Sequence, residues 1–426
     1  MYVFKKQIAF TKSFQNHLRL ENFFIILIVL GIPLNLYKNR FYDASWTIGE
    51  WLISYAGGFA RRGLPGELIY IISRYLKISP IYLIWFLCVI FLICLGILLK
   101  FYCKPFFKKS LLFSQLMLLG PLSEDYFIRK DIFIVLLYGL SLLTFNLFYK
   151  NKFNKFTCFL LVNFFSIIAI LSHESYGIWA LPSITIIFFI FERKEQKNKI
   201  NKFLNTGLSI LPSIIIFSLC WFFRGTPDQS LSIHLSWQDF QDILPSLGKL
   251  DNPFPEGAIA ALGTNNGKIY SDSIISQFNL LIFWHPGMWL LTIFLVIKLF
   301  IGHEKNIYQK SKRILICFQL IAFFPMFIFV DIGRWIFMWI TSSAFLFSFL
   351  IKVFGIESIV NQTKTLKYSN ILTKVIPAFS SELTYNRVLL FLGIPHCCWS
   401  IGRYLISNPI GFAIKNVIFY FKSIFL

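Results

Sequence analysis

The run SPIYLIWFLCVIFLICLGILL at residues 79–99 decides the fold class of this chain. It carries no charged side chain, and about 20 apolar residues are enough for a helix to cross the hydrocarbon core of a bilayer. Similar runs recur at about 22–37, 110–122, 131–149, 156–172, 175–191, 203–223, 278–300, 314–330, 335–354 and 388–406. With a last apolar stretch at 410–426, the sequence predicts an all-α, polytopic transmembrane helical bundle of about 11–12 spans.

The composition agrees with one membrane domain that covers residues 1–426. Of 426 residues, 56% are hydrophobic and only 14% are charged, a balance that excludes an ordinary soluble globular domain. The formal net charge is +21. In a soluble protein this excess would favour nucleic acid as a partner. Here the lysines stand at the ends of apolar runs, so the sequence favours anionic membrane lipids as partners and no nucleic acid.

The distribution of lysine predicts the orientation in the membrane. Lysine-rich segments recur at every second loop, in residues 5–12, 100–109, 150–155, 193–202 and 305–313. Lysine and arginine accumulate in cytoplasmic loops. We therefore expect a multi-pass membrane protein with a cytoplasmic N-terminus. The two main outer loops are then 38–78, expected to contain interfacial helices, and the large loop 224–277.

The first outer loop combines polar and apolar helical faces in DASWTIGEWLISYAGGFARRGLPGE, residues 43–67. At helical spacing its polar stripe comprises Asp43, Thr47, Glu50 and Ser54. We expect this helix to lie in the membrane interface, and a second amphipathic segment to begin at Pro65. A simple anchor whose arginines reach lipid phosphates is the alternative. It explains Arg61 and Arg62 but leaves the acids unexplained.

Other charged residues near the ends of spans fall on the same predicted side. They are Glu124, Asp125, Arg129, Lys130, Asp131, His173, Glu174, Asp331 and Arg334. Each has a structural alternative, such as a helix cap or a local ion pair between Asp331 and Arg334. A charge at membrane depth costs roughly 2.5–3.5 kcal/mol on insertion scales, so repeated use of charge at one face favours a common site.

The residue types indicate the chemistry of that site. Arginine presents a planar fork that suits phosphate, whereas lysine offers a point charge. A lipid-linked phosphate held by arginines, with an acid as general base for a sugar hydroxyl, fits this set. No P-loop, dinucleotide or HExxH motif occurs, so no cofactor is expected and no motif supports a divalent metal.

With an acid soon after the first span and arginines on the outer side, the layout resembles bacterial surface-polysaccharide enzymes. These are the GT-C-type glycosyltransferases and the Wzy-type O-antigen or capsule polymerases. The resemblance implies a polyprenyl-(di)phosphate-linked sugar donor and a glycan acceptor at the periplasmic face. It also places the protein in a bacterial inner membrane and matches Asp43 and Glu50 to the acid that follows the first span. The full set of candidate catalytic residues is Asp43, Glu50, Glu124, Asp125, His173 and Glu174. Substrate binding would fall to Arg61, Arg62, Arg129, Lys130, Asp331 and Arg334.

Two other function classes stay open from the sequence. A transporter or flippase for lipid-linked glycans would place charges near the middle of broken helices, often in repeated halves. A non-enzymatic assembly partner or an acyltransferase-like protein is the third possibility, although no His-Asp type motif occurs. The polar residues at one end of the spans favour the glycosyltransferase hypothesis over both.

Overall fold

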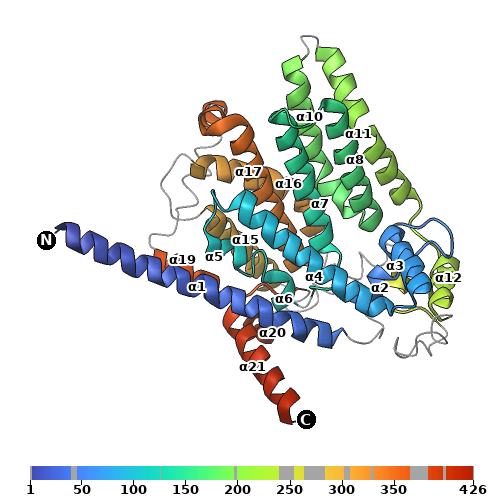
Figure 1. The fold of residues 1–426 in the computed structure, drawn as a ribbon, viewed down its shortest axis with the longest axis horizontal. Helices are drawn as coiled ribbons and strands as arrows, with labels where there is room; N and C mark the ends of the chain where they lie inside the picture. Colours follow the sequence, from blue (N-terminus) through green and yellow to red (C-terminus); the bar gives the residue numbers. More distant parts are fainter. Residues whose placement is uncertain are drawn as a thin grey trace.

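The computed structural model describes residues 2–39, 46–124, 126–195, 199–238, 254–262, 284–301, 308–327, 331–364, 382–396 and 400–425. All regular structure within these ranges is helical (Figure 1). Among the described residues, six helices are long and apolar enough to cross a membrane. They are the apolar part of α1 (Leu20–Lys38 of Tyr2–Lys38), α4 (Pro80–Leu98) with its continuation, α7 (Asp131–Tyr149), α8 (Lys155–Ser172), α11 (Lys199–Phe222) and α17 (Ile332–Lys364).

Helix α17 forms the centre of the bundle. In its most apolar 18-residue stretch, 89% is buried inside the protein, whereas the corresponding stretches of α1, α4, α8 and α11 are only 22–39% buried. The latter helices expose most of their apolar side chains, as a lipid-facing helix does. The all-helical multi-pass class predicted from the sequence is therefore confirmed.

Three predicted spans are interrupted in the structure. Residues 110–122 form two short helices, α5 (Lys109–Phe113) and α6 (Gly120–Ser123), because the backbone becomes extended at Ser114. Residues 175–191 divide into α9 (Ser175–Trp179) and α10 (Leu181–Glu195). Residues 388–406 divide into α19 (Glu382–Phe391) and α20 (Ile401–Ser407). The prediction of a single helix in each region was wrong.

Further helices complete the described chain. Helix α16 (Tyr308–Phe327) packs against α17, α15 (Trp284–Ile301) packs against α16, and α21 (Pro409–Phe425) packs against α1. In the large loop, α12 (Pro227–Gln238) and α13 (Gly257–Leu262) pack together, and α13 also contacts the first loop. The Trp237 indole N–H donates to the carbonyl of Leu52 at 2.7 Å. The described parts of residues 38–78 and 224–277, the two predicted outer loops, therefore pack against each other.

The first loop contains α2 (Trp46–Trp51) and α3 (Gly63–Leu76). A helix, α3, is present where the second segment was predicted, but it begins at Gly63, two residues before Pro65, and it exposes Leu68 and Ile72 on one side. The expected interfacial stripe is wrong for α2, because Glu50 is 1% exposed and Ser54 is fully buried. A Cβ on Gly66 of α3 would lie 1.9 Å from the carbonyl oxygen of Ile53. The two halves of the loop are thus packed backbone to backbone, and Glu50 faces the bundle.

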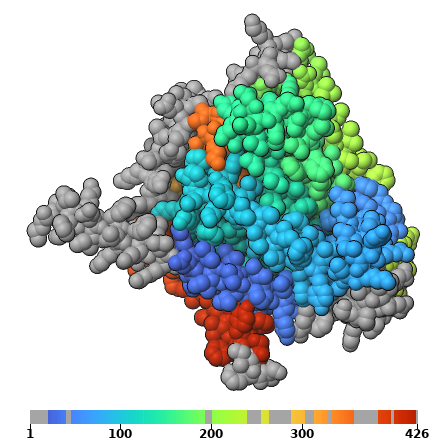
Figure 2. All heavy atoms as spheres, in the orientation of Figure 1, coloured from blue at the N-terminus to red at the C-terminus, as the bar shows by residue number. Residues whose placement is uncertain are grey.

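The helices share two distinct ends. Helix α8 ends, and α7 and α17 begin, beside α2 and α3, which we name the cluster end (Figure 1). The opposite end, where Lys100, Lys104 and Lys155 lie, we name the lysine end. Figure 2 shows α1 and α4 side by side on one face, with α21 below them.

Candidate functional site

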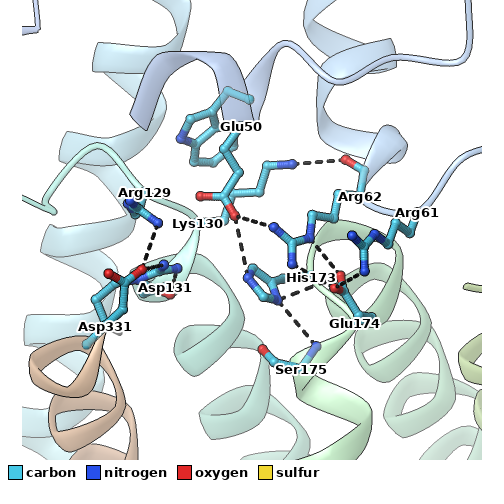
Figure 3. Close-up of polar contacts among 12 residues, drawn as sticks. Glu50, Arg61, Arg62, Arg129, Lys130, Asp131, His173, Glu174, Ser175 and Asp331 are labelled. Carbon is cyan, nitrogen blue, oxygen red and sulfur yellow. Dashed lines mark hydrogen bonds and ion pairs between the residues drawn. The ribbon is translucent and has the colours of Figure 1, made fainter. Parts of the chain in front are cut away.

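Glu50 stands at the end of α2 with its carboxylate buried among charged groups (Figure 3). Neither carboxylate oxygen accepts a hydrogen bond from any described residue. The nearest cations and donors are Arg62 Nη1 and His173 Nε2, at 3.6 and 3.5 Å from Oε1. The indole N–H of the next residue, Trp51, donates to the Ile128 carbonyl and holds α2 against the segment before α7. An acid that is buried but not hydrogen-bonded is costly, which favours a functional role.

Glu174, in contrast, is saturated with hydrogen bonds. Arg62 donates from Nε and Nη2 to its two oxygens, both at 2.7 Å, and Arg61 Nη1 donates at 3.2 Å. Burial alone would raise the pKa of Glu174, but these guanidinium groups hold it well below its usual range. Glu174 is therefore a fixed anion and a poor proton acceptor.

Arg62 is positioned by an unusual backbone. Its φ of 65° is in the left-handed region, where residues other than glycine are uncommon, and it forms the N-cap of α3. Its guanidinium binds Glu174, and its carbonyl oxygen accepts a hydrogen bond from Lys130 Nζ at 2.9 Å. Backbone strain of this kind persists where surrounding contacts enforce it, often at functional sites. The turn thereby links the first loop to α7 and α8.

His173 lies in extended backbone immediately after α8. The Ser175 backbone N–H approaches its Nδ1 at 3.3 Å, so Nδ1 acts as acceptor and the ring proton is assigned to Nε2, facing Glu50. Burial and the charge of Arg62 lower the pKa of His173 to about 3. The imidazole is therefore neutral at physiological pH.

A second group of charges lies where α7 and α17 begin. Arg334 donates hydrogen bonds from Nε and Nη2 to the two carboxylate oxygens of Asp131, at 2.6 and 2.8 Å. Its Nη1 donates to Asp331 at 2.8 Å. Arg129 Nη1 donates to the same Asp331 oxygen at 3.3 Å. Asp331 also pairs with His396 Nε2 at 3.5 Å. The local pairing of Asp331 with Arg334 is thus real, but it is one part of a larger network.

Arg129 and Lys130 are the least compensated cations of this network. Burial and repulsion by Arg334 lower the pKa of Arg129, whose Nε has no hydrogen-bond partner among the described residues. Burial lowers the pKa of Lys130 to about 7, and its side chain is fully buried. The pKa of Arg62, in contrast, is raised because Glu174 outweighs its burial. An entering anion would therefore gain most at Arg129 and Lys130.

Glu50 connects the two groups electrostatically. Burial would raise its pKa, but the charges of Arg334, Arg129 and Arg62 lower it to about 2. We use the name charged cluster for the combined set. It consists of Glu50, Arg61, Arg62, Arg129, Lys130, Asp131, His173, Glu174, Asp331 and Arg334.

The structure thus brings together nine of the sequence-predicted site residues at the cluster end. Glu124 is buried immediately after α6. Burial, together with the charges of Glu124 and Asp131, raises the pKa of the nearby Tyr126 phenol. Asp43 and Asp125 lie outside the described residues. The sequence placed Asp131 among the charged residues of this side but gave it no role, and it missed His396. His396 belongs to a segment that was predicted to be one continuous span.

Metal binding finds no support in this geometry. Among the described residues, no group of three or more His, Cys, Asp or Glu side chains is placed to hold a metal ion. Glu174 and Asp131 are each held in bidentate contact by an arginine.

Comparison with protein-family models, with curated proteins and with solved structures found no match for this chain.

Proposed function

We propose that the chain is a membrane glycosyltransferase or polysaccharide polymerase that uses a polyprenyl-(di)phosphate-linked sugar at the cluster end. The observation that carries this proposal is the Glu50 carboxylate, buried, without a hydrogen bond, and surrounded by cations. A GT-C-like arrangement and a periplasmic location of the cluster end belong to the same proposal. They are supported by the charged first loop and by the lysines at the opposite end.

In the proposed reaction, the acceptor sugar hydroxyl attacks the anomeric carbon of the donor. The bond from that carbon to the lipid phosphate oxygen breaks, and the phosphate leaves with the bonding electrons. Glu50 takes the hydroxyl proton as general base. Arg129 and Lys130 hold the leaving phosphate, because their positive charges are the least compensated in the free site.

A carboxylate with a pKa of about 2 is a weak base, so the free site requires a change before catalysis. The donor provides that change. Its phosphate charge opposes the charges of Arg129 and Arg334, which hold the pKa of Glu50 down, and the pKa rises when the donor is bound. Glu50 thus becomes a competent base only beside its substrate.

The positions of the charges favour this reaction over transport. Asp131 is the first residue of α7, Arg334 is the third residue of α17, and His173 follows the last residue of α8. The described charged cluster is therefore at helix ends, whereas a transporter places its binding site near the bilayer midplane.

Binding of undecaprenyl phosphate, the proposed leaving group, tests the anion site without knowledge of the sugar. We expect Arg129→Gln to weaken binding to the purified full chain, with undecaprenol as the uncharged reference ligand. Loss of a charge-assisted contact that acts on the leaving group should also slow transfer by about 10²–10³-fold. Arg74→Gln is the matched control, because Arg74 is on the exposed part of α3 and contacts Tyr70.

Glu50→Gln separates binding from chemistry. We expect the variant to bind undecaprenyl phosphate at least as well as the wild type but to abolish long-chain glycan on gels of host-cell extracts. Glu67→Gln, whose carboxylate accepts from the Tyr55 backbone N–H, is the control in the same loop. Normal glycan in Glu50→Gln at normal membrane abundance would refute the assignment of the base and favour a structural or transport role.

A further inference from the structure

A cavity of about 370 Å³ lies at the lysine end, away from the charged cluster. It is bordered by α1, by the end of α4 and by α5. Its polar rim contains Glu21, Lys100, Lys104 and Lys109, and its inner wall includes Leu112 and Leu118. A charged rim over an apolar wall resembles the environment of a lipid headgroup and the start of its acyl chains.

The lysines of the rim are not equivalent. Lys109 Nζ donates to Glu21 Oε2 at 3.1 Å and is therefore neutralised within the protein. The side chains of Lys100 and Lys104 make no hydrogen bond or ion pair with any residue that the structure describes, although Lys100 Nζ lies 5.8 Å from the centre of the Phe101 ring. Two positive charges thus remain for an external anion, which gives the cavity charge complementarity to a phosphate group.

A helix irregularity shapes the rim at this point. Helix α4 continues as a π-helical turn, Leu99–Cys103, and the Lys104 N–H donates to the Leu99 carbonyl at 3.1 Å. Single π-helical turns are rare and often occur at functional sites. Both free lysines belong to or immediately follow this turn. The irregularity is therefore a second feature, independent of charge, that marks the same position.

The surroundings of the cavity fit a lipid better than a soluble anion. Ile25 lines the cavity on α1 and is 40% exposed. On α4, Ile97 follows the lining residue Gly96 and is 51% exposed. These side chains offer apolar surface for acyl chains on both helices that border the cavity, and a free phosphate would leave this surface unused.

We infer that the cavity between α1, α4 and α5 binds the headgroup of an anionic glycerophospholipid at the lysine end. The phosphate would contact Lys100 and Lys104, and the acyl chains would follow the exposed apolar faces of α1 and α4. This site is separate from the proposed donor site at the opposite end of the bundle.

Native mass spectrometry of the purified, delipidated full chain tests the inference. We expect phosphatidylglycerol to bind in preference to phosphatidylcholine with the same acyl chains. Lys100→Gln/Lys104→Gln should weaken phosphatidylglycerol binding roughly 30-fold, at about fivefold for each lysine near an anionic headgroup. Lys150→Gln/Lys152→Gln is the matched control, since it removes two exposed lysines from the same end but outside the cavity.

A neutral variant distinguishes a shaped site from diffuse attraction. A Cβ on Gly96 would meet Leu118 Cδ1 at an ordinary 3.6 Å, so Gly96→Ala fits, and Gly96→Leu should extend into the cavity. We expect Gly96→Leu to reduce phosphatidylglycerol binding without loss of charge, and Gly96→Ala to have a smaller effect. Equal losses in the two double-lysine variants, equal binding of phosphatidylcholine, or full competition by soluble glycerol phosphate would each overturn the inference.

Discussion

Glu50 and Glu174 are both buried acids near Arg62, yet their surroundings differ. Glu174 accepts three hydrogen bonds from Arg61 and Arg62, whereas Glu50 accepts none from the described residues. A carboxylate held in this way organises its neighbours, and one without hydrogen bonds is available as the base of the proposed reaction. The two acids, which look alike in the sequence, thus acquire different roles from the arginines placed around them.

The difference predicts an order of stabilities. Glu174→Gln removes the main counter-charge of two partly buried guanidinium groups, whose side chains are 12% and 25% exposed. Breaking a fully buried ion pair costs about 3–5 kcal/mol, which is the upper bound for this loss. Glu50→Gln removes no hydrogen bond, so we expect a smaller loss. Thermal unfolding of both variants in the same detergent measures this order. A larger loss for Glu50→Gln would contradict the division of roles between the two acids.

From the lowered pKa of Lys130 we predict that anion binding depends on pH. Its pKa of about 7 in the free protein means that the ammonium loses its proton as the pH rises through neutrality. The protonated form binds an anion better, so the affinity for undecaprenyl phosphate should fall above about pH 7, by up to tenfold per pH unit. In Lys130→Arg, which stays charged, the dependence should be much weaker above pH 7. Equal pH profiles for the two proteins would exclude Lys130 from the anion site.

At the scale of elements, the contact between α2 and α3 depends on a residue without a side chain. Gly66→Ala would drive a Cβ to within 1.9 Å of the Ile53 carbonyl oxygen, so the backbone must shift. We expect a loss of about 1–3 kcal/mol of stability, as for overpacked interiors, together with loss of activity. Gly207→Ala on α11, where no atom lies within 4 Å, is the control and should be tolerated. Comparable unfolding temperatures for the two variants would contradict this packing.

Continuous helices were predictable from sequence and interrupted ones were not. Hydropathy is a local property, and it located α7 and α8 nearly to the residue. The breaks at 110–122 and 388–406 depend on contacts between distant segments. Gln115 Nε2 donates to the carbonyl of Leu392 at 2.8 Å, and the rings of Tyr126 and His396 lie 5.5 Å apart. Each segment thus supplies polar partners for the other, which allows non-helical backbone inside a membrane protein.

The same limit applies to the site. The sequence indicated which charged residues gather at one end, because their positions at span ends follow from the order of the helices. It could not indicate that Arg62 pairs with Glu174, or Arg334 with Asp131, across more than 100 residues of chain. Those pairings depend on helix packing, and they determine which acid is left without a hydrogen bond.

At the scale of the whole molecule, the lysine distribution predicts one orientation. The N-terminus and the loop between α7 and α8 should be cytoplasmic, and the segment between α11 and α12 should be periplasmic. Reporter fusions after Lys152 and after Thr226 should therefore report opposite compartments, because each reporter is active on only one side. If both fusions report the same compartment, the predicted topology and the proposed periplasmic donor site are both wrong.

The pairing of Asp131 with Arg334 also has a consequence for biosynthesis. The two residues are 203 positions apart, and a ribosome adds about 5–20 residues per second. Helix α7 is therefore synthesised roughly 10–40 s before its partner arginine exists. Asp131 is the first residue of α7, so water at the membrane surface can solvate it during this interval. Insertion of α17 then withdraws both charges from water, and the last central helix to be translated completes the site.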